Sequence, residues 1–219
     1  MELLSVGTAR STWLFDMNEL NPHGVRMFPS AIELLREYYQ FEKVPASSYD
    51  VDEGKGLSFK NGSFKVTDGN SIQVELTIYA DGIAANSYSS TRHTDDFIDN
   101  VLSLTTREFG LRYRPEMVRH KLPLSEITVR LDGSLAKLYP KLADFAAKIS
   151  GFHKSIKTAF ETGGISFWTD SSESNIKPAA FSIERKLGAP FSESRFFSKA
   201  SLHTDDHLSL LVDFEKLLT

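Results

Sequence analysis

The chain contains no cysteine among its 219 residues. Without cysteine there are no disulfide bonds, no thiolate zinc sites, no iron–sulfur clusters and no cysteine nucleophiles. Uninterrupted apolar runs of about 18 residues, which predict membrane-spanning helices, are also missing. The first residues lack the charged segment and the continuous apolar segment that are typical of a secretory signal. We therefore expect a cytoplasmic protein that does not have a membrane as its partner.

Established catalytic and nucleotide-binding motifs are equally absent: there is no phosphate-binding loop, no G-x-G-x-x-G and no G-x-S-x-G. Residues 134–137 match the S-x-x-K pattern of serine acyl-enzymes, but the companion motifs are missing, so we interpret Ser134 as a turn or capping residue. Residues 49–54 resemble a fragment of a calcium loop that lacks the distant bidentate glutamate, and we interpret them as a solvated loop. We expect no cofactor and favour a protein that is not an enzyme.

A strong excess of charge of one sign is missing as well. The formal net charge is −4 and the pI is about 5.9, while 41% hydrophobic and 25% charged residues are ordinary values for a globular protein. Nucleic-acid binders usually carry a concentrated positive field, so this balance disfavours a nucleic-acid partner unless a local basic patch exists. One such patch is residues 107–121, which contain six basic residues and two glutamates.

The first half of the sequence predicts a strand, a helix, four strands and a second helix. The expected elements are residues 11–17, 29–39, 57–60, 63–66, 72–78, 83–88 and 94–109. The apolar face predicted for the first helix consists of Ala31, Leu34, Leu35 and Tyr38. Asn61-Gly62 tolerates the backbone angles of a type I′ turn and therefore predicts a hairpin between residues 57–60 and 63–66.

The second half predicts the same order of elements. They are residues 127–131, 140–150, 156–160, 165–169, 181–187, 196–202 and a last helix from 204, and the face predicted for the helix at 140–150 is Leu142, Phe145, Ala146 and Ile149. The dipeptides ending at Pro29 and Pro140 are 111 residues apart, and two His-Thr-Asp-Asp sequences, at 93–96 and 203–206, are 110 apart. We predict an α+β fold of two duplicated β-α-β4-α units.

The predicted division is a first repeat at residues 1–110, a basic linker at 111–124 and a second repeat at 125–219. The order of elements in each repeat is similar to that of TATA-binding-protein-like domains, over nearly the whole chain but without a shared motif. The resemblance implies a continuous, saddle-like antiparallel sheet with helices on one face.

A saddle that grips DNA needs basic residues and apolar wedges on its open face. The predicted open face instead carries polar residues of mixed sign, namely Gln73, Glu75, Thr77 and Tyr79 in the first half and Ser182, Glu184 and Lys186 in the second. We therefore do not expect DNA binding through the sheet.

His203 and His207, four residues apart with two aspartates between them, are the most metal-like arrangement in the sequence. If Thr204 caps a helix, His203 precedes that helix, so the two rings need not share a face. Capping by Thr94 and Thr204, with aspartates in the first turns, accounts for both His-Thr-Asp-Asp copies without a metal. The roles of His93 and His203 stay unassigned.

Two features predict binding surfaces. The basic stretch is a candidate for contact with an acidic partner or a nucleic-acid backbone, although a solvated linker whose arginines pair with carboxylates of the two repeats is the favoured interpretation. Neighbouring strand residues point to opposite faces, so one of Phe196 and Phe197 is expected to be exposed. The candidate binding residues are Arg112, Arg114, Arg119, His120, Lys121 and Phe197.

Three hypotheses for function follow. The leading one is a non-enzymatic binding or assembly protein that engages another protein through an exposed sheet face and the central basic segment. The first alternative is a nucleic-acid-associated subunit that binds through Arg112, Arg114, Arg119 and Lys121. The second is a hydrolase or small-molecule-binding enzyme with a site between the repeats. The identity of the partner and the oligomeric state stay open.

Overall fold

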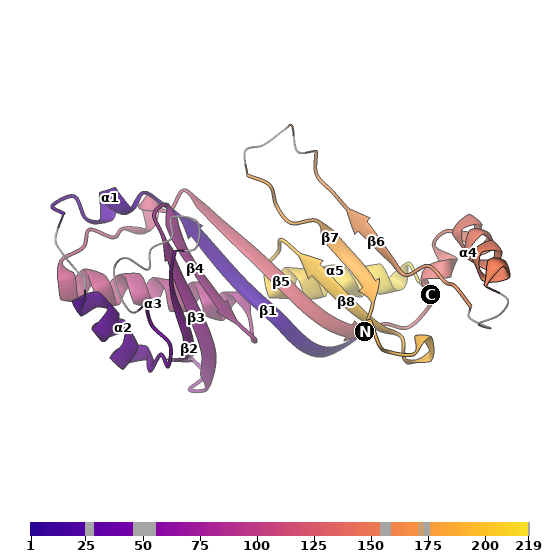
Figure 1. The fold of residues 1–219 in the computed structure, drawn as a ribbon, viewed down its shortest axis with the longest axis horizontal. Coiled ribbons are helices and arrows are strands. Elements are labelled where there is room, and N and C mark those ends of the chain that lie inside the picture. The colour runs from indigo at the N-terminus through magenta and orange to yellow at the C-terminus, as the bar shows by residue number, and fades with distance from the viewer. Residues whose placement is uncertain (25–28, 46–55, 154–158, 171, 173–175, 219) are drawn as a thin grey trace. The chain divides into compact units, whose positions relative to one another are not determined.

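The computed structural model describes residues 1–24, 29–45, 56–153, 159–170, 172 and 176–218 (Figure 1). The chain is α+β, and its strands form an eight-stranded antiparallel sheet. The strands are β1 (Glu2–Leu14), β2 (Leu57–Lys65), β3 (Ser71–Tyr79), β4 (Gly82–Ser87), β5 (His120–Arg130), β6 (Gly164–Phe167), β7 (Phe181–Arg185) and β8 (Arg195–Ala200). Their order in the sheet is β2-β3-β4-β1-β5-β8-β7-β6.

The described residues contain five α-helices and three short 3₁₀ helices. The α-helices are α1 (Met17–Leu20), α2 (Ser30–Tyr39), α3 (Thr91–Phe109), α4 (Pro140–Phe152) and α5 (Thr204–Lys216). The 3₁₀ helices are η2 (Pro115–Met117), η3 (Leu135–Lys137) and η4 (Phe191–Glu193). Within the part of the chain that is described, no helix has the length and apolar character needed to cross a membrane.

Contacts divide the chain into two compact units. The first, called here the Thr8–Ser125 unit, also includes residues 202–204. The second, called the Glu126–Ser201 unit, also includes residues 1–7 and 205–219. Each unit has its own hydrophobic core.

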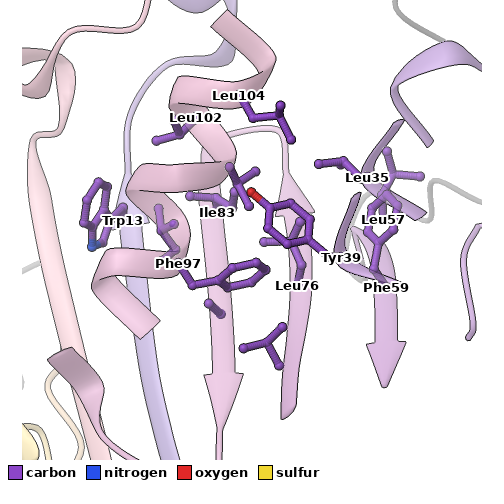
Figure 2. Close-up of a cluster of buried hydrophobic side chains, with 14 of the residues drawn as sticks. Trp13, Leu35, Tyr39, Leu57, Phe59, Leu76, Ile83, Phe97, Leu102 and Leu104 are labelled. Atoms are coloured by element: carbon purple, nitrogen blue, oxygen red, sulfur yellow. The ribbon is translucent and has the colours of Figure 1, made fainter. Parts of the chain in front are cut away.

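The core of the Thr8–Ser125 unit lies between the sheet and the helices α2 and α3 (Figure 2). β3 alternates as predicted, because Val74 and Leu76 are buried, whereas Glu75 between them is half-buried and Gln73 before them is exposed. The ring of Phe97 from α3 meets the ring of Tyr39 from α2 edge to face, with 5.0 Å between the centroids. Burying an aromatic ring of this size contributes roughly 1.5–3 kcal/mol to folding.

The hairpin predicted at Asn61-Gly62 is wrong. Residues 57–65 form one strand, β2, which pairs with β3 on both sides of a register shift between Phe59 and Gly62. Asn61 adopts a positive φ of 55°, so the left-handed angle that Asn tolerates makes a β-bulge instead of a turn. Among the described residues, three strands therefore follow α2 in the first half, where four were predicted.

The predicted apolar face of α2 is also displaced. Ile32, Leu35 and Tyr39 are buried, whereas Tyr38 is 54% exposed. The predicted face with Tyr38 and the observed face with Tyr39 both have helical spacing, and the position of the sheet determines which face is buried. The buried Tyr39 hydroxyl keeps a partner because it donates to Asn100 Oδ1 at 2.7 Å.

In the Glu126–Ser201 unit, β6, β7 and β8 confirm the strands predicted from residues 165, 181 and 196, although each is shorter than predicted. The strand predicted at 156–160 falls mostly on residues outside those described, and residues 159 and 160 are not in a strand. The acidic loop at 49–54 also lies outside the described residues. Ser134 caps η3 as predicted, since its hydroxyl accepts from the Ala136 amide at 3.2 Å.

The inner face predicted for α4 is not packed as expected. Ala146 is buried, but Leu142 is 45% exposed and Phe145 is 60% exposed. The core of this unit is instead formed mainly by residues of β5, β7, β8 and α5. Its most deeply buried members include Ile127, Val129, Leu131, Ile183, Phe196 and Leu211.

Strand order repeats between the two halves: it is β1-β4-β3-β2 in the first and β5-β8-β7-β6 in the second. Within the described residues, each half contains a strand, a helix, three strands and a helix, with α1 as an additional short helix in the first. This is a repetition of topology, which by itself does not establish a duplicated sequence.

Candidate functional site

The exposed face of β1, β3 and β4 in the Thr8–Ser125 unit is built by strand alternation. In β1, Ala9, Ser11 and Trp13 are buried, so the residues between them point to the opposite face. The register places Arg10 beside Asn86 of β4 and Asn86 beside Glu75 of β3. The predicted polar residues of β3 lie on this face, which continues onto β4 and then β1.

A shallow hollow of about 160 Å³ lies on this face. Its lining residues are Thr8, Arg10, Gln73, Glu75, Asn86, Ser87 and Tyr88. Arg10 Nε donates to Asn86 Oδ1 at 2.6 Å, and the Tyr88 side chain is 64% exposed. Sites for drug-sized ligands usually have about 300–1,000 Å³, so this hollow suits contact with part of a larger molecule.

Side-chain amides extend the polar face toward the edge of the sheet. Gln73 Nε2 donates to Asn61 Oδ1 at 3.1 Å, and Asn61 Nδ2 donates to Glu42 Oε2 at 2.8 Å. The β-bulge places Asn61 where its amide reaches both neighbours. The face therefore offers oriented donors and acceptors with one guanidinium and one carboxylate at its centre.

The basic segment is anchored to the fold and is partly neutralised. Arg112, Arg114 and Arg119 are all exposed. The amide of Arg112 donates to the Leu20 carbonyl at 3.0 Å, and Arg119 Nη2 lies 2.9 Å from a carboxylate oxygen of Glu19. An ion pair this exposed contributes about 0–1 kcal/mol. His120 and Lys121 are the first residues of β5, so they lie in the sheet.

Lys121 lies beside a set of carboxylates. Its Nζ sits 3.7 Å from the centroid of the Trp13 ring, and Trp13 Nε1 donates to Asp95 Oδ1 at 2.7 Å. A hollow of about 420 Å³ at this place is lined by Trp13, Phe64, Asp95, Asp96, Asp99, Asn100, Ser103 and Lys121. Three carboxylates around one ammonium group make this a poor site for phosphate.

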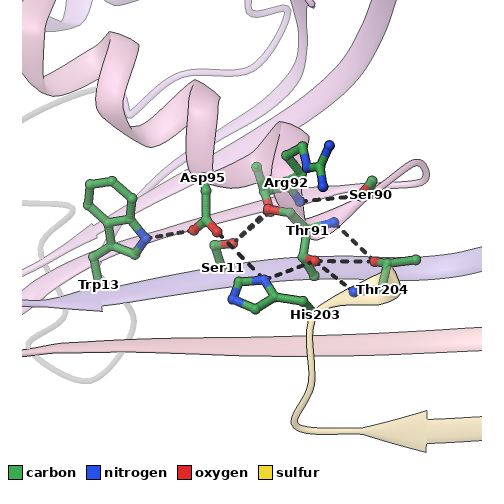
Figure 3. Close-up of polar contacts among 9 residues, drawn as sticks. Ser11, Trp13, Ser90, Thr91, Arg92, Asp95, His203 and Thr204 are labelled. Carbon is green, nitrogen blue, oxygen red and sulfur yellow. Dashed lines mark hydrogen bonds and ion pairs between the residues drawn. The ribbon is translucent and has the colours of Figure 1, made fainter. Parts of the chain in front are cut away.

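A buried polar cluster joins residues from both His-Thr-Asp-Asp copies (Figure 3). Thr204 Oγ1 accepts from the Thr91 amide at 3.1 Å, and Thr91 Oγ1 accepts from the Thr204 amide at 2.9 Å. His203 Nδ1 lies 3.3 Å from Thr91 Oγ1 and 3.7 Å from Asp95 Oδ2. All these residues belong to the Thr8–Ser125 unit.

The capping roles predicted for both threonines are wrong in detail. Ser90 caps α3 by accepting from the Arg92 amide at 3.2 Å. Thr94 lies inside the helix, where its hydroxyl donates to the Thr91 carbonyl at 2.9 Å. Thr204 is the first residue of α5, and its hydroxyl accepts from the amide of Thr91 at the start of α3. The Thr204 hydroxyl therefore still satisfies a free helix amide, but one that belongs to α3.

The cluster does not have the geometry of a catalytic triad. Among the described residues, the only hydroxyl bonded to the His203 ring is that of Thr91, through the same Nδ1 that faces Asp95. A triad places the carboxylate and the nucleophile on different ring nitrogens. The described hydroxyls of Ser11, Thr91 and Thr204 are bonded to each other or to main-chain groups of the cluster.

His207, the other half of the metal-like arrangement, is buried in the core of the Glu126–Ser201 unit. Its Nε2 lies 2.8 Å from Ser198 Oγ, and the Phe181 ring packs against it edge to face at 5.9 Å. Burial lowers the pKa of His207 to about 4, so the ring is neutral at pH 7. Searching the described residues alone, no group of three or more His, Asp or Glu side chains is arranged to hold a metal.

Phe196 and Phe197 lie on opposite faces of β8, as predicted. Phe196 is fully buried, whereas Phe197 is half-buried and has Lys186 Nζ 5.5 Å from its ring centroid. Glu184 lies directly opposite Phe197 on β7. This face therefore has mixed charge around one aromatic ring.

Five residues that line the hollow were missed from the sequence: Thr8, Arg10, Asn86, Ser87 and Tyr88. The predicted first strand began at residue 11, whereas β1 begins at Glu2, so the alternation was not extended back to Thr8 and Arg10. An earlier start of that strand would have placed Arg10 on the polar face with Gln73 and Glu75.

Comparison of the sequence with protein-family models finds no match, and comparison with curated proteins finds none either. Among solved structures, the chain is similar to one described as Methanococcus jannaschii TBP. The TM-score is 0.44 at 14% sequence identity, covering 99% of this chain and 97% of that chain. Because the TM-score is this low, we derive neither fold nor function from the similarity.

Proposed function

We propose that the chain is a non-enzymatic binding protein that recognises a protein partner through the exposed sheet face of the Thr8–Ser125 unit. The observation that carries this proposal is the polar surface around Arg10, Asn86 and Tyr88. There, hydrogen-bonding side chains surround a shallow hollow that is too small for a typical ligand. An exposed tyrosine beside an arginine is also typical of the residues that contribute most at protein interfaces.

The charge of the face favours a protein over a nucleic acid. Phosphate binding draws on several Lys or Arg side chains, each of which neutralises one phosphate. The hollow has one cation, Arg10, and one carboxylate, Glu75, in its lining. Donors and acceptors in near balance match the backbone and side chains of a polypeptide better than a polyanion.

The nucleic-acid alternative draws its support from the exposed Arg112, Arg114 and Arg119. Two observations weaken it: Arg119 is paired with Glu19, and Lys121 lies among carboxylates. An enzyme is the least supported reading, because the hydroxyls of the Thr91–Thr204 cluster and the ring of His207 are taken up by structural hydrogen bonds.

Site-specific photocrosslinking in the native host tests the proposal. A photoreactive phenylalanine analogue replaces Tyr88 on the sheet face, and in a matched control it replaces Tyr38, an exposed tyrosine on α2. We expect a protein adduct at position 88 that Arg10→Glu abolishes, and no such adduct at position 38. Equal labelling at both positions would refute recognition through this face. An adduct that nuclease removes would favour nucleic acid.

We also propose that the repeated topology reflects an internal duplication, with repeats at 1–110 and 125–219 joined by 111–124. The identical strand order of the two halves and the two His-Thr-Asp-Asp sequences support it. An alignment of homologues in which the two halves resemble each other beyond chance would test it, and halves that are unrelated throughout would contradict it.

A further inference from the structure

The two edge strands of the sheet are protected to very different degrees. β2, at one end of the strand order, carries Lys60 and Lys65 and the bulge at Asn61. Its outer edge is also occupied, because Lys43 and Lys60 exchange two backbone hydrogen bonds of 3.3 and 2.9 Å. Lysines, bulges and covering segments are the devices by which natural sheets prevent pairing with another chain.

In the described part of the chain, β6, at the other end of the order, shows no lysine, bulge or covering segment. Residues 162–169 read Thr-Gly-Gly-Ile-Ser-Phe-Trp-Thr, with no charge and no proline. Ile, Phe, Trp and Thr are residues with high strand propensity. Among the described residues, only β7 pairs with β6. Phe167 is 59% exposed and Trp168 is 82% exposed.

The register shows which backbone groups of β6 face outward. The Arg185 amide donates to the Gly163 carbonyl at 2.7 Å, and Gly164 lies opposite Glu184 in the antiparallel pair. Hydrogen-bonded pairs alternate with non-bonded pairs along such a ladder. Gly163 and Ile165 therefore direct their amides and carbonyls toward β7, whereas those of Gly164 and Ser166 point away from the sheet.

We propose that this edge is the site of self-association, in which β6 of a second copy pairs antiparallel with β6 about a two-fold axis at Ser166. A two-fold axis places the same residues on both sides, so the uncharged segment meets no like charge. Ser166 lies opposite Ser166 of the partner subunit, and each exchanges an amide and a carbonyl with the other.

The side chains beside Ser166 fit the same arrangement. In this register Trp168 lies opposite Gly164 of the partner subunit, where the missing side chain leaves space for the indole. Large aromatic residues that cover a glycine on the neighbouring strand are a known way to stabilise a sheet edge. Pairing would bury part of both Trp168 rings. This surface is separate from the hollow at Arg10, so the proposal does not depend on the proposed partner there.

The mass of the full-length chain in solution, measured by light scattering over a concentration series, tests the proposal. Ser166→Pro removes one outward-facing amide and leaves the hydrogen bonds to β7 intact, because proline is tolerated at an edge. Ser166→Thr keeps the amide and is the matched control. We expect dimers for the natural chain and for Ser166→Thr, and monomers for Ser166→Pro.

A second variant tests the proposal independently, in case Ser166→Pro disturbs folding. Trp168→Ala removes an exposed side chain, and we expect it to weaken dimerisation by about tenfold or more, in line with tryptophan as an interface anchor. Circular dichroism should be the same for all variants. A natural chain that is monomeric throughout would overturn the proposal. So would Ser166→Pro and Trp168→Ala variants that dimerise as tightly as Ser166→Thr.

Discussion

Acidification should destabilise the Glu126–Ser201 unit through one buried side chain, His207. Its ring is buried among Phe181 and Ser198, and burial lowers its pKa to about 4. In the unfolded chain the same ring has the ordinary pKa of about 6.5. Between pH 6.5 and 4 the unfolded state therefore binds more protons than the folded state, and the free energy of unfolding falls as the pH falls.

The size of the effect follows from the difference between the two pKa values. The pKa of His207 is lower by about 2.5 pH units in the folded state, and each pH unit corresponds to roughly 1.4 kcal/mol. The free energy of unfolding should therefore fall by about 3 kcal/mol, with no loss above pH 6.5 and the full loss near pH 4. This is a substantial part of the 5–15 kcal/mol that typically separates folded from unfolded states.

Urea unfolding from pH 7 to pH 4, followed by circular dichroism, measures this loss. The comparison variant is His207→Phe, because Phe97 occupies the corresponding buried position 110 residues earlier. Ser198 stays satisfied in that variant because its hydroxyl also donates to the Ser182 carbonyl at 2.7 Å. Carboxylates titrate equally in both proteins, so the difference between the two curves isolates His207.

His153→Gln is the matched control, since His153 is an exposed histidine of the same unit. It should keep the pH dependence of the natural chain. If His207→Phe loses as much stability as the natural chain between pH 6.5 and 4, the assignment of the effect to His207 is refuted.

Two further substitutions test the packing of the Thr8–Ser125 unit, each measured by urea unfolding. Thr91→Ala leaves the Thr204 amide without its acceptor and should cost about 1–2 kcal/mol, whereas Thr91→Ser keeps the hydroxyl and should cost much less. Gly62→Ala places a Cβ 2.4 Å from Cε1 of the buried Phe41 and should cost about 1–3 kcal/mol, whereas Gly151→Ala meets nothing within 4 Å and should be neutral or stabilising. If Thr91→Ala were as stable as Thr91→Ser, the hydrogen bond to the Thr204 amide would not contribute to stability. If Gly62→Ala cost no more than Gly151→Ala, the close packing of Phe41 against Gly62 would be refuted.

Strand alternation made much of the sheet predictable. In β3, apolar residues alternate with polar ones from Ile72 to Ile78, so the inner and outer faces follow from the sequence alone. The same rule placed Phe196 inside and Phe197 outside on β8. The polar face that carries the candidate site was therefore partly visible, although Arg10 was missed with the early part of β1.

Errors arose where two local solutions have similar energies. Asn61 takes a left-handed backbone angle in a hairpin and in a β-bulge alike, and pairing with β3 selects the bulge. On α2, Tyr38 and Tyr39 both complete an apolar stripe at helical spacing, and packing against core rings such as Phe97 selects Tyr39.

The sequence by itself determined the kinds of elements, the faces of the strands and the absence of thiol chemistry, because these depend on neighbours within a few residues. Tertiary structure alone decided which hydroxyl satisfies which amide. Thr91 and Thr204 are 113 residues apart and satisfy each other's amides, although each stands near a sequence that suggests a local cap. A free helix amide can donate to any acceptor oxygen within reach, and the fold of the whole chain determines which oxygen that is.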